Sequence, residues 1–137
     1  MSEQGAPRAR VLVVGGGVMG GTLVTALLAA GWSARDVEVI ETDPGRAEVL
    51  RRTHGVVTSA SAAAAAPRAD IVLVAVKPDV VGDVLAQVGP VLRHGAPVIG
   101  VAAGVPLAFY EERLPLGTPV VRVMPNTPAV IGKGAAA

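Results

Sequence analysis

Three glycines near the N-terminus have the spacing of a nucleotide-binding turn. The stretch VLVVGGGVMGGTL passes from an apolar segment through Gly15, Gly17 and Gly20, which fit the pattern G-x-G-x-x-G. In such a turn the first glycine permits a tight bend, the second lets the backbone approach a pyrophosphate, and the third lets helix and strand pack closely. The free N–H groups of Val18 and Met19 would face the anion at the positive end of the helix. The stretch predicts dinucleotide binding, with an ordinary glycine-rich turn as the alternative.

An acidic pair follows the next apolar run. Glu41 lies about twenty residues beyond Gly20, where an acidic side chain accepts hydrogen bonds from the adenosine ribose. With Asp43 it favours NADH over NADPH, because a 2′-phosphate beside two carboxylates would be repelled. Asp43 can instead cap the following helix, and Arg46, one helical turn further on, could reach a phosphate. The pattern therefore predicts NAD(P)H as the cofactor, with a weak preference for NADH.

Small and polar residues end three later apolar runs. Lys77 and Pro78 follow one run, Ala103 follows the next, and Asn126 lies between two prolines after the last. Ligand crevices open at the carboxyl ends of parallel strands, so Lys77 and Asn126 are candidates to lie near a substrate. A solvated lysine, a plain turn and a turn-forming asparagine are the structural alternatives. The sequence shows no Ser/His/Asp triad, metal-ligand cluster or pair of catalytic carboxylates, so it assigns no catalytic residue and predicts no metal site.

The elements that must position these residues alternate along the chain. The strand segments are almost wholly apolar, which is typical of strands covered on both faces of a parallel sheet. Strand–helix alternation with short connections predicts an α/β fold, a Rossmann-type, doubly wound, mainly parallel sheet with helices on both faces. Strands are expected at 10–14, 37–40, 56–58, 71–76, 97–101 and 120–124, and helices at 19–30, 44–54, 61–66, 78–88 and 107–114.

The composition argues against several classes of protein. A length of 137 residues, 51% of them hydrophobic, suits one domain with a real core. A net charge of +1 and an aromatic content of 2% argue against a nucleic-acid partner. The chain has no cysteine, which fits a reducing cytoplasm. Without an apolar signal core or a run of membrane-spanning length, we expect a cytoplasmic protein with no membrane partner.

Four segments together resemble one enzyme family. In order and spacing, GGGVMGG, AVKP, AAGV and RVMPNTPA are similar to the motifs of Δ1-pyrroline-5-carboxylate reductase, from Arg10 to Gly134. The resemblance implies dinucleotide contacts in the glycine turn and at the ends of the later strands, and it places Asn126 near the nicotinamide and substrate. The expected cofactor-binding residues are therefore Gly15, Gly16, Gly17, Val18, Met19, Gly20, Glu41, Asp43, Ser61, Val76, Lys77, Pro78 and Ala103.

The chain departs from the family pattern at several of these positions. Val18 stands where the family commonly has asparagine, so a side-chain amide is lost. Thr42 and Asp43 stand where a Ser, Arg or Asn commonly lies near a 2′-phosphate, which puts a preference for NADPH in doubt. A serine that commonly precedes the AAG segment is also missing.

The resemblance also implies a reaction and a domain plan. The family transfers hydride from nicotinamide C4 to the C=N carbon of pyrroline-5-carboxylate, which gives L-proline in proline biosynthesis. The expected plan is a flexible tail at 1–9, an NAD(P)-binding Rossmann domain at 10–128, and at 129–137 the truncated start of a segment leading to a second domain. That domain, absent here, makes full-length relatives homo-oligomeric and completes their active site. We therefore expect this chain alone to be inactive or nearly so.

Two other functions stay open from the sequence. One is a non-catalytic dinucleotide-binding module or a gene remnant, which would share the glycine turn and need no substrate site. The other is a reductase of another small imino or hydroxy acid.

Overall fold

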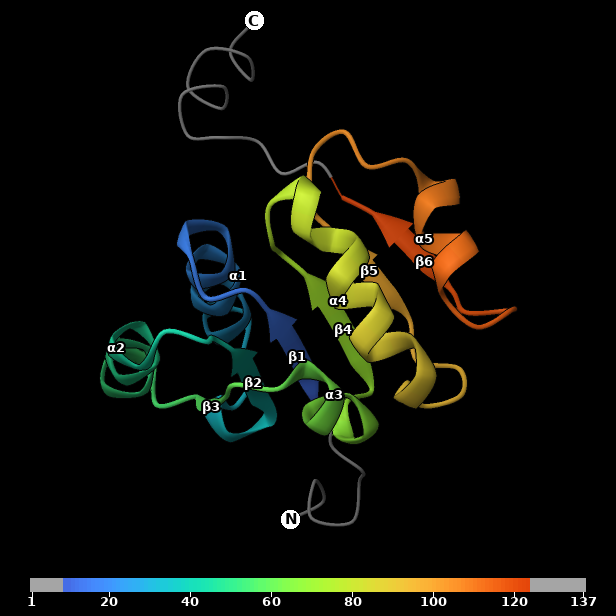
Figure 1. Ribbon diagram of the computed structural model, residues 1–137. Helices are drawn as coiled ribbons and strands as arrows, with labels where there is room; N and C mark the ends of the chain where they lie inside the picture. Colours follow the sequence, from blue (N-terminus) through green and yellow to red (C-terminus); the bar gives the residue numbers. More distant parts are fainter. Residues whose placement is uncertain (1–8, 124–137) are drawn as a thin grey trace, which may run out of the picture.

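The structure is a computed structural model, and it describes residues 9–123. Within this range strands and helices alternate along the chain, with short 3₁₀ turns between some of them (Figure 1). The strands are β1 (Val11–Val14), β2 (Val37–Ile40), β3 (Val57–Ser59), β4 (Ile71–Val74), β5 (Val98–Gly100) and β6 (Val120–Arg122). The helices are α1 (Val18–Ala29), α2 (Pro44–His54), α3 (Ala62–Ala65), α4 (Val81–Val88) and α5 (Leu107–Arg113).

The six strands form one parallel sheet in the order β3-β2-β1-β4-β5-β6. From β1 the chain adds β2 and then β3 on one side of the sheet. It then crosses to the other side of β1, where it adds β4, β5 and β6 in turn. This order confirms the predicted doubly wound, Rossmann-type fold. The direction reverses between β1 and β4, and a ligand crevice is expected there, outside the carboxyl ends of the strands.

Alternate side chains of β1 enter two separate cores. Val11 and Val13 pack on one face with Val24 of α1 and Leu50 of α2. The next residue along, Leu12, faces the opposite side of the sheet, where α3, α4 and α5 lie. Because both faces of the central strands are covered, these strands consist of continuous apolar runs instead of an alternating pattern.

The face that carries α1 and α2 is covered unevenly. Ile99 of β5 belongs to this face but is only partly buried. Its register partner Val121 on β6 is 49% exposed. In Figure 1, α1 and α2 lie toward the β1–β3 end of the sheet, away from β5 and β6. Among the described residues, this side of β5 and β6 therefore presents open apolar surface.

The boundaries of β2 and α2 agree with prediction, α1 and β3 are shifted by one residue, and the other elements are shorter than expected. The apolar run 71–76 pairs as a strand only to Val74, because Val76 turns away from the sheet after Ala75 N–H donates to the Val14 carbonyl at 2.9 Å. The helix expected over 78–88 begins as a 3₁₀ turn at Pro78–Val80 before α4.

Tyr110 is the largest fully buried side chain among the described residues, and its ring packs on a glycine. A Cβ at Gly100 would collide with the Tyr110 hydroxyl, so the ring occupies the space that a side chain on β5 would need. The hydroxyl is the buried side-chain polar atom without a hydrogen-bond partner in the described part of the chain. Burial raises the pKa of Tyr110 above its ordinary value of 10.0, and the nearby positive charge of Arg122 opposes part of that rise.

We expect Tyr110→Phe to leave stability unchanged or to raise it by about 1 kcal/mol, since the variant removes an unpaired buried hydroxyl. The pKa shift adds a pH dependence. Below pH 10 the hydroxyl is neutral in both states. Above pH 10 the unfolded wild type releases this proton and the folded chain keeps it, so the free energy of unfolding falls. Urea unfolding at pH 8 and above pH 10 measures this effect, and the free energy of unfolding should fall less between the two pH values in the variant than in the wild type. A variant clearly less stable than the wild type at pH 8 would contradict this account.

Candidate functional site

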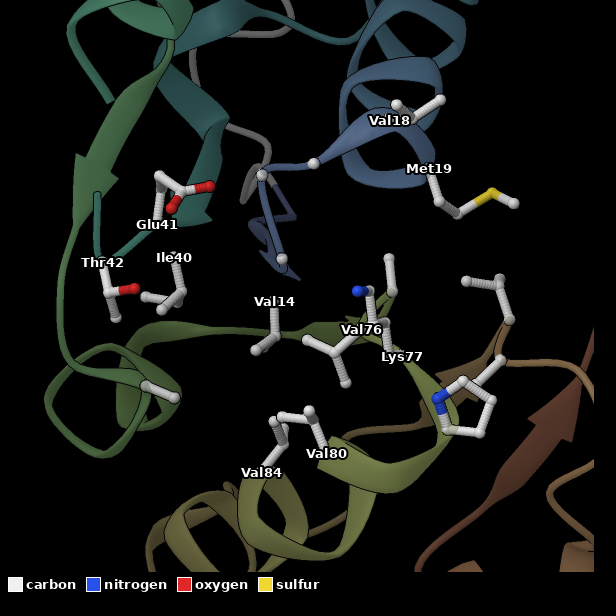
Figure 2. Close-up of a pocket in the computed structure, with 18 of the residues that line it drawn as sticks. Val14, Val18, Met19, Ile40, Glu41, Thr42, Val76, Lys77, Val80 and Val84 are labelled. Atoms are coloured by element: carbon white, nitrogen blue, oxygen red, sulfur yellow. The ribbon is translucent and has the colours of Figure 1, made fainter. Parts of the chain in front are cut away.

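A cavity of about 770 Å³ opens at the carboxyl ends of the central strands (Figure 2). It lies at the reversal of strand order between β1 and β4, where the fold predicts a ligand crevice. Most of its lining is apolar, and its walls come from the ends of four strands, the starts of α1 and α3, and residues within α4. The segments that contribute most are 14–19, 40–42, 75–78 and 101–103.

Two of the three motif glycines are required by the backbone itself. Gly15 has φ +114°, in the region that favours glycine, and its N–H donates to the Ile40 carbonyl at 3.1 Å. A Cβ at Gly15 would lie 2.6 Å from the Ala75 carbonyl oxygen. A Cβ at Gly20 would collide with the carbonyl oxygen of Gly15, so α1 packs against the turn as closely as a glycine allows. Gly20 itself does not line the cavity.

Gly17 has a different environment. It lines the cavity as the N-cap of α1, and a Cβ there would meet no protein atom within 4 Å. Its φ of −75° is open to any residue, so neither the backbone nor the packing explains a glycine. The first turn of α1 carries no acidic residue and no side-chain cap, which leaves its first N–H groups free of side-chain partners. These features together fit a pyrophosphate seated against Gly17.

Glu41 lies at the end of β2, against the glycine turn. Its side chain is buried, with only 6% of its surface exposed. One carboxylate oxygen, Oε2, accepts the Asp43 N–H at 2.9 Å, and the other, Oε1, lies 3.5 Å from Arg46 Nε. A Cβ at Gly16 would approach Glu41 Oε1 to 2.5 Å, so glycine at position 16 makes room for the acid. Figure 2 shows Glu41 beside Thr42 at one side of the cavity.

Two of the predicted contact residues serve as helix caps and do not line the cavity. Asp43 Oδ2 accepts the Arg46 N–H at 2.8 Å at the start of α2. Ser61 Oγ accepts the Ala64 N–H at 3.1 Å at the start of α3, although the flanking Ala60 and Ala62 do line the cavity. Contact of Asp43 and Ser61 with a cofactor stays a prediction.

The ends of β4 and β5 form the rest of the site. The predicted cofactor contacts Val76, Lys77, Pro78 and Ala103 all line the cavity, and their contact with a cofactor stays a prediction. Lys77 and Glu41 are the charged residues in its lining, and they come from different strand ends. Asn126, the other predicted substrate neighbour, lies outside the described residues.

Sequence reasoning missed the contribution of α4 to this cavity. Val80, which directly precedes α4, and Val84 and Gln87 within it line the cavity, spaced four and three residues apart on one helical face. That spacing is visible in the sequence and could have indicated a shared face. Which surface the face meets depends on how α4 crosses the sheet.

Residues 9–123 contain no group of three or more His, Cys, Asp or Glu side chains placed to hold a metal ion. Within the same range, no helix combines the length and apolar character needed to cross a membrane.

The sequence matches a family model described as NADP oxidoreductase, coenzyme F420-dependent, over residues 10–104. Among curated relatives, a pyrroline-5-carboxylate reductase of Mycobacterium leprae is 42% identical over 132 residues, which are 92% of this chain and 44% of the relative. The enzyme of that name from Corynebacterium melassecola is 37% identical over 127 residues, 90% of this chain and 47% of the relative. The chain therefore spans about half the length of the curated relatives it matches.

Solved structures show the same relationship. A pyrroline-5-carboxylate reductase from Coxiella burnetii superposes with a TM-score of 0.84 at 28% identity, covering 91% of this chain and 47% of that one. The pyrroline carboxylate reductase of Plasmodium falciparum, solved with NADP bound, superposes with a TM-score of 0.76 at 25% identity, covering 91% of this chain and 45% of that one.

Proposed function

The chain belongs to the family described as NADP oxidoreductase, coenzyme F420-dependent, and on that basis we propose that it is the cofactor-binding part of a pyrroline-5-carboxylate reductase. The observation that carries the proposal is the bare surface of Gly17 beside the start of α1, which has no side-chain cap, in the wall of a cavity large enough for a dinucleotide. The relatives that match over nine-tenths of the chain supply the reaction class.

In this proposal the different walls of the cavity bind different parts of the cofactor and substrate. The N–H groups at the start of α1 hold the pyrophosphate, and the buried carboxylate of Glu41 accepts the adenosine ribose hydroxyls. The small residues Ala102 and Ala103 leave room for a flat ring against the end of β5. Lys77 offers a cation to an anionic group at the end of β4. When bound, NAD(P)H supplies the hydride that reduces the C=N carbon of pyrroline-5-carboxylate to give L-proline.

The proposal also includes the second half of the longer relatives, which this chain does not match. The open apolar surface on β5 and β6, with Val121 about half exposed, suits coverage by further protein. We propose that a second domain covers it in the longer relatives and completes their active site as a homo-oligomer. A cytoplasmic location belongs to the same proposal.

A non-catalytic dinucleotide-binding module is the second candidate. It is favoured by the lining of the described cavity, whose charged side chains, Glu41 and Lys77, can both be accounted for by cofactor binding. This reading needs a cofactor site and no substrate site.

Calorimetric titration of NADH and NADPH into the purified 137-residue chain tests the cofactor site. We expect saturable binding of at least one nucleotide, and an assay with pyrroline-5-carboxylate should show little or no turnover. A folded chain that binds neither nucleotide would contradict the proposed function. Turnover at the rate of a longer relative would show that the second domain is not required.

Attaching the second half of a relative to this chain separates the two candidates. Restored imine reduction supports the reductase, whereas unchanged nucleotide binding without any activity favours the non-catalytic module.

A further inference from the structure

We infer that a second cavity, at the amino ends of β1, β2 and β3, binds a small organic anion, a carboxylate carried on a short apolar body. This cavity has a volume of about 280 Å³ and lies at the opposite edge of the sheet from the proposed cofactor site. Its lining comes from residues at the starts of the three strands and from the end of the 3₁₀ turn Ala66–Arg68. The two cavities share no lining residue, so the inference does not rest on the proposed function.

The second cavity exists because one row of side chains on the sheet is incompletely covered. Leu12, Glu38 and Val57 are register partners on β1, β2 and β3, so they face the same side of the sheet. On that side α3 has only four residues and packs against α4 (Figure 1). Exposure therefore rises along the row, from 1% for Leu12 to 16% for the Glu38 side chain and 45% for Val57. The row forms a half-open floor with apolar surface at its outer end.

Three arginines line the cavity around this floor, and one of them is already paired. Arg68 Nη2 donates to Glu38 Oε2 at 2.8 Å, and Nη1 donates to the Ala64 carbonyl at 3.1 Å. A charged residue inside the apolar strand β2 is tolerated because this cation balances it. Asp36, the other acid in the lining, is engaged as well.

The other two arginines have no acidic partner. Among residues 9–123, no ion pair engages the side chain of Arg10 or Arg35. The backbone of Arg10 is fixed, because its N–H donates to Asp70 Oδ2 at 2.8 Å and its carbonyl accepts the Asp70 N–H at 2.9 Å. Arg93 occupies the second oxygen of that acid. The cavity therefore offers two guanidinium groups, whose paired donors match a carboxylate, above a partly apolar floor.

These features favour a small carboxylate over other ligands. A volume of about 280 Å³ lies just below the usual range of drug-sized pockets, so a dinucleotide would not fit. Inorganic phosphate would pair with the arginines and leave the apolar surface of Val57 unused. An uncharged apolar molecule would leave the arginines unused. A carboxylate on a short chain or ring uses both.

Titration of benzoate into the isotope-labelled 137-residue chain, followed by NMR, tests this site. Benzoate is the probe because it joins a carboxylate to a compact apolar ring. We expect saturable binding with a Kd of about 1 mM and amide shifts centred on Leu12, Glu38 and Val57. Inorganic phosphate and benzyl alcohol each lack one half of the ligand, and they should bind at least about tenfold more weakly.

Variants of the lining separate the two halves of the site. Arg10→Gln combined with Arg35→Gln removes two exposed cations, so the fold should survive while benzoate binding weakens at least about tenfold. Val57→Thr keeps the β-branched shape but removes apolar surface, and it should weaken binding about threefold. Arg52→Gln is the matched control, because it removes the same charge from an exposed arginine of α2 outside the cavity, and it should leave the affinity unchanged.

Absence of saturable benzoate binding to the folded chain would overturn the inference, as would shifts centred on the glycine turn at 15–17. A loss in Arg52→Gln as large as in the double variant would overturn it too, since it would show general attraction to a positive surface. Tighter binding of phosphate than of benzoate at the same residues would contradict the choice of a carboxylate ligand. The titrations of NADH and NADPH test the proposed function separately, and it stands or fails independently of these outcomes.

Discussion

Replacing Gly20 by alanine is expected to destabilise the chain by about 3 kcal/mol or more, a large part of the stability of a domain of this size. The Cβ of the new residue would collide with the carbonyl oxygen of Gly15. Both partners of this contact are tied to the backbone, so no side-chain rotation can relieve it. The strain would separate α1 from the turn that leads into it from β1. Urea unfolding followed by circular dichroism measures the loss.

Gly21→Ala is the matched control for this prediction. It adds the same methyl group one residue later in the same helix, where a Cβ would meet no atom within 4 Å. Alanine is favoured over glycine in a helix interior by about 0.8–1 kcal/mol, so this variant should be more stable than the wild type. Equal effects of the two changes would show that helix propensity matters here and the contact with Gly15 does not.

Replacing Gly17 by alanine is expected to weaken dinucleotide binding about a hundredfold while the fold survives. The added methyl group would project into the cavity at the point proposed for the pyrophosphate, where the protein leaves open space. The backbone there suits alanine, and the loss of a glycine N-cap costs at most about 1 kcal/mol. Calorimetric titration of NADH and an unfolding curve for the same sample separate loss of binding from loss of structure.

Two variants make this prediction sharper. Gly17→Ser restores a good N-cap, so it should keep full stability and still bind poorly. Gly21→Ala, which adds a methyl group to the same helix away from the cavity, should bind NADH as the wild type does. Wild-type affinity in Gly17→Ala would place the pyrophosphate elsewhere and remove the main support for the proposed function.

Local signals in the sequence were sufficient for much of the fold. The limits of α2 follow from Asp43 at its N-cap, Pro44 in its first turn and Gly55, with φ +75°, at its C-terminal end. These signals depend on a few consecutive residues and need no tertiary contact. The continuous apolar runs similarly indicated strands covered on both faces, and the structure confirms the parallel sheet.

Other features depended on how the elements cross. The apolar run after Asp70 gave no sign that pairing ends at Val74, since Val76 is as apolar as its predecessors and turns into the cavity instead. The contribution of α4 to the cavity was missed for a related reason. Its apolar spacing shows a face, but the crossover from β4 to β5 determines what that face meets.

The different roles of Glu41 and Asp43 also depend on how the elements are assembled. From the sequence it was clear that two acids follow β2, that Asp43 could cap α2 and that a glycine turn precedes α1. The assembled sheet was needed to show that Glu41 is buried against Gly16 and lines the cavity, whereas Asp43 does not line it. The physical reason is that a cap needs only its own next few residues, whereas a cavity wall is formed by strand ends that are distant in the sequence and meet only when the sheet is assembled.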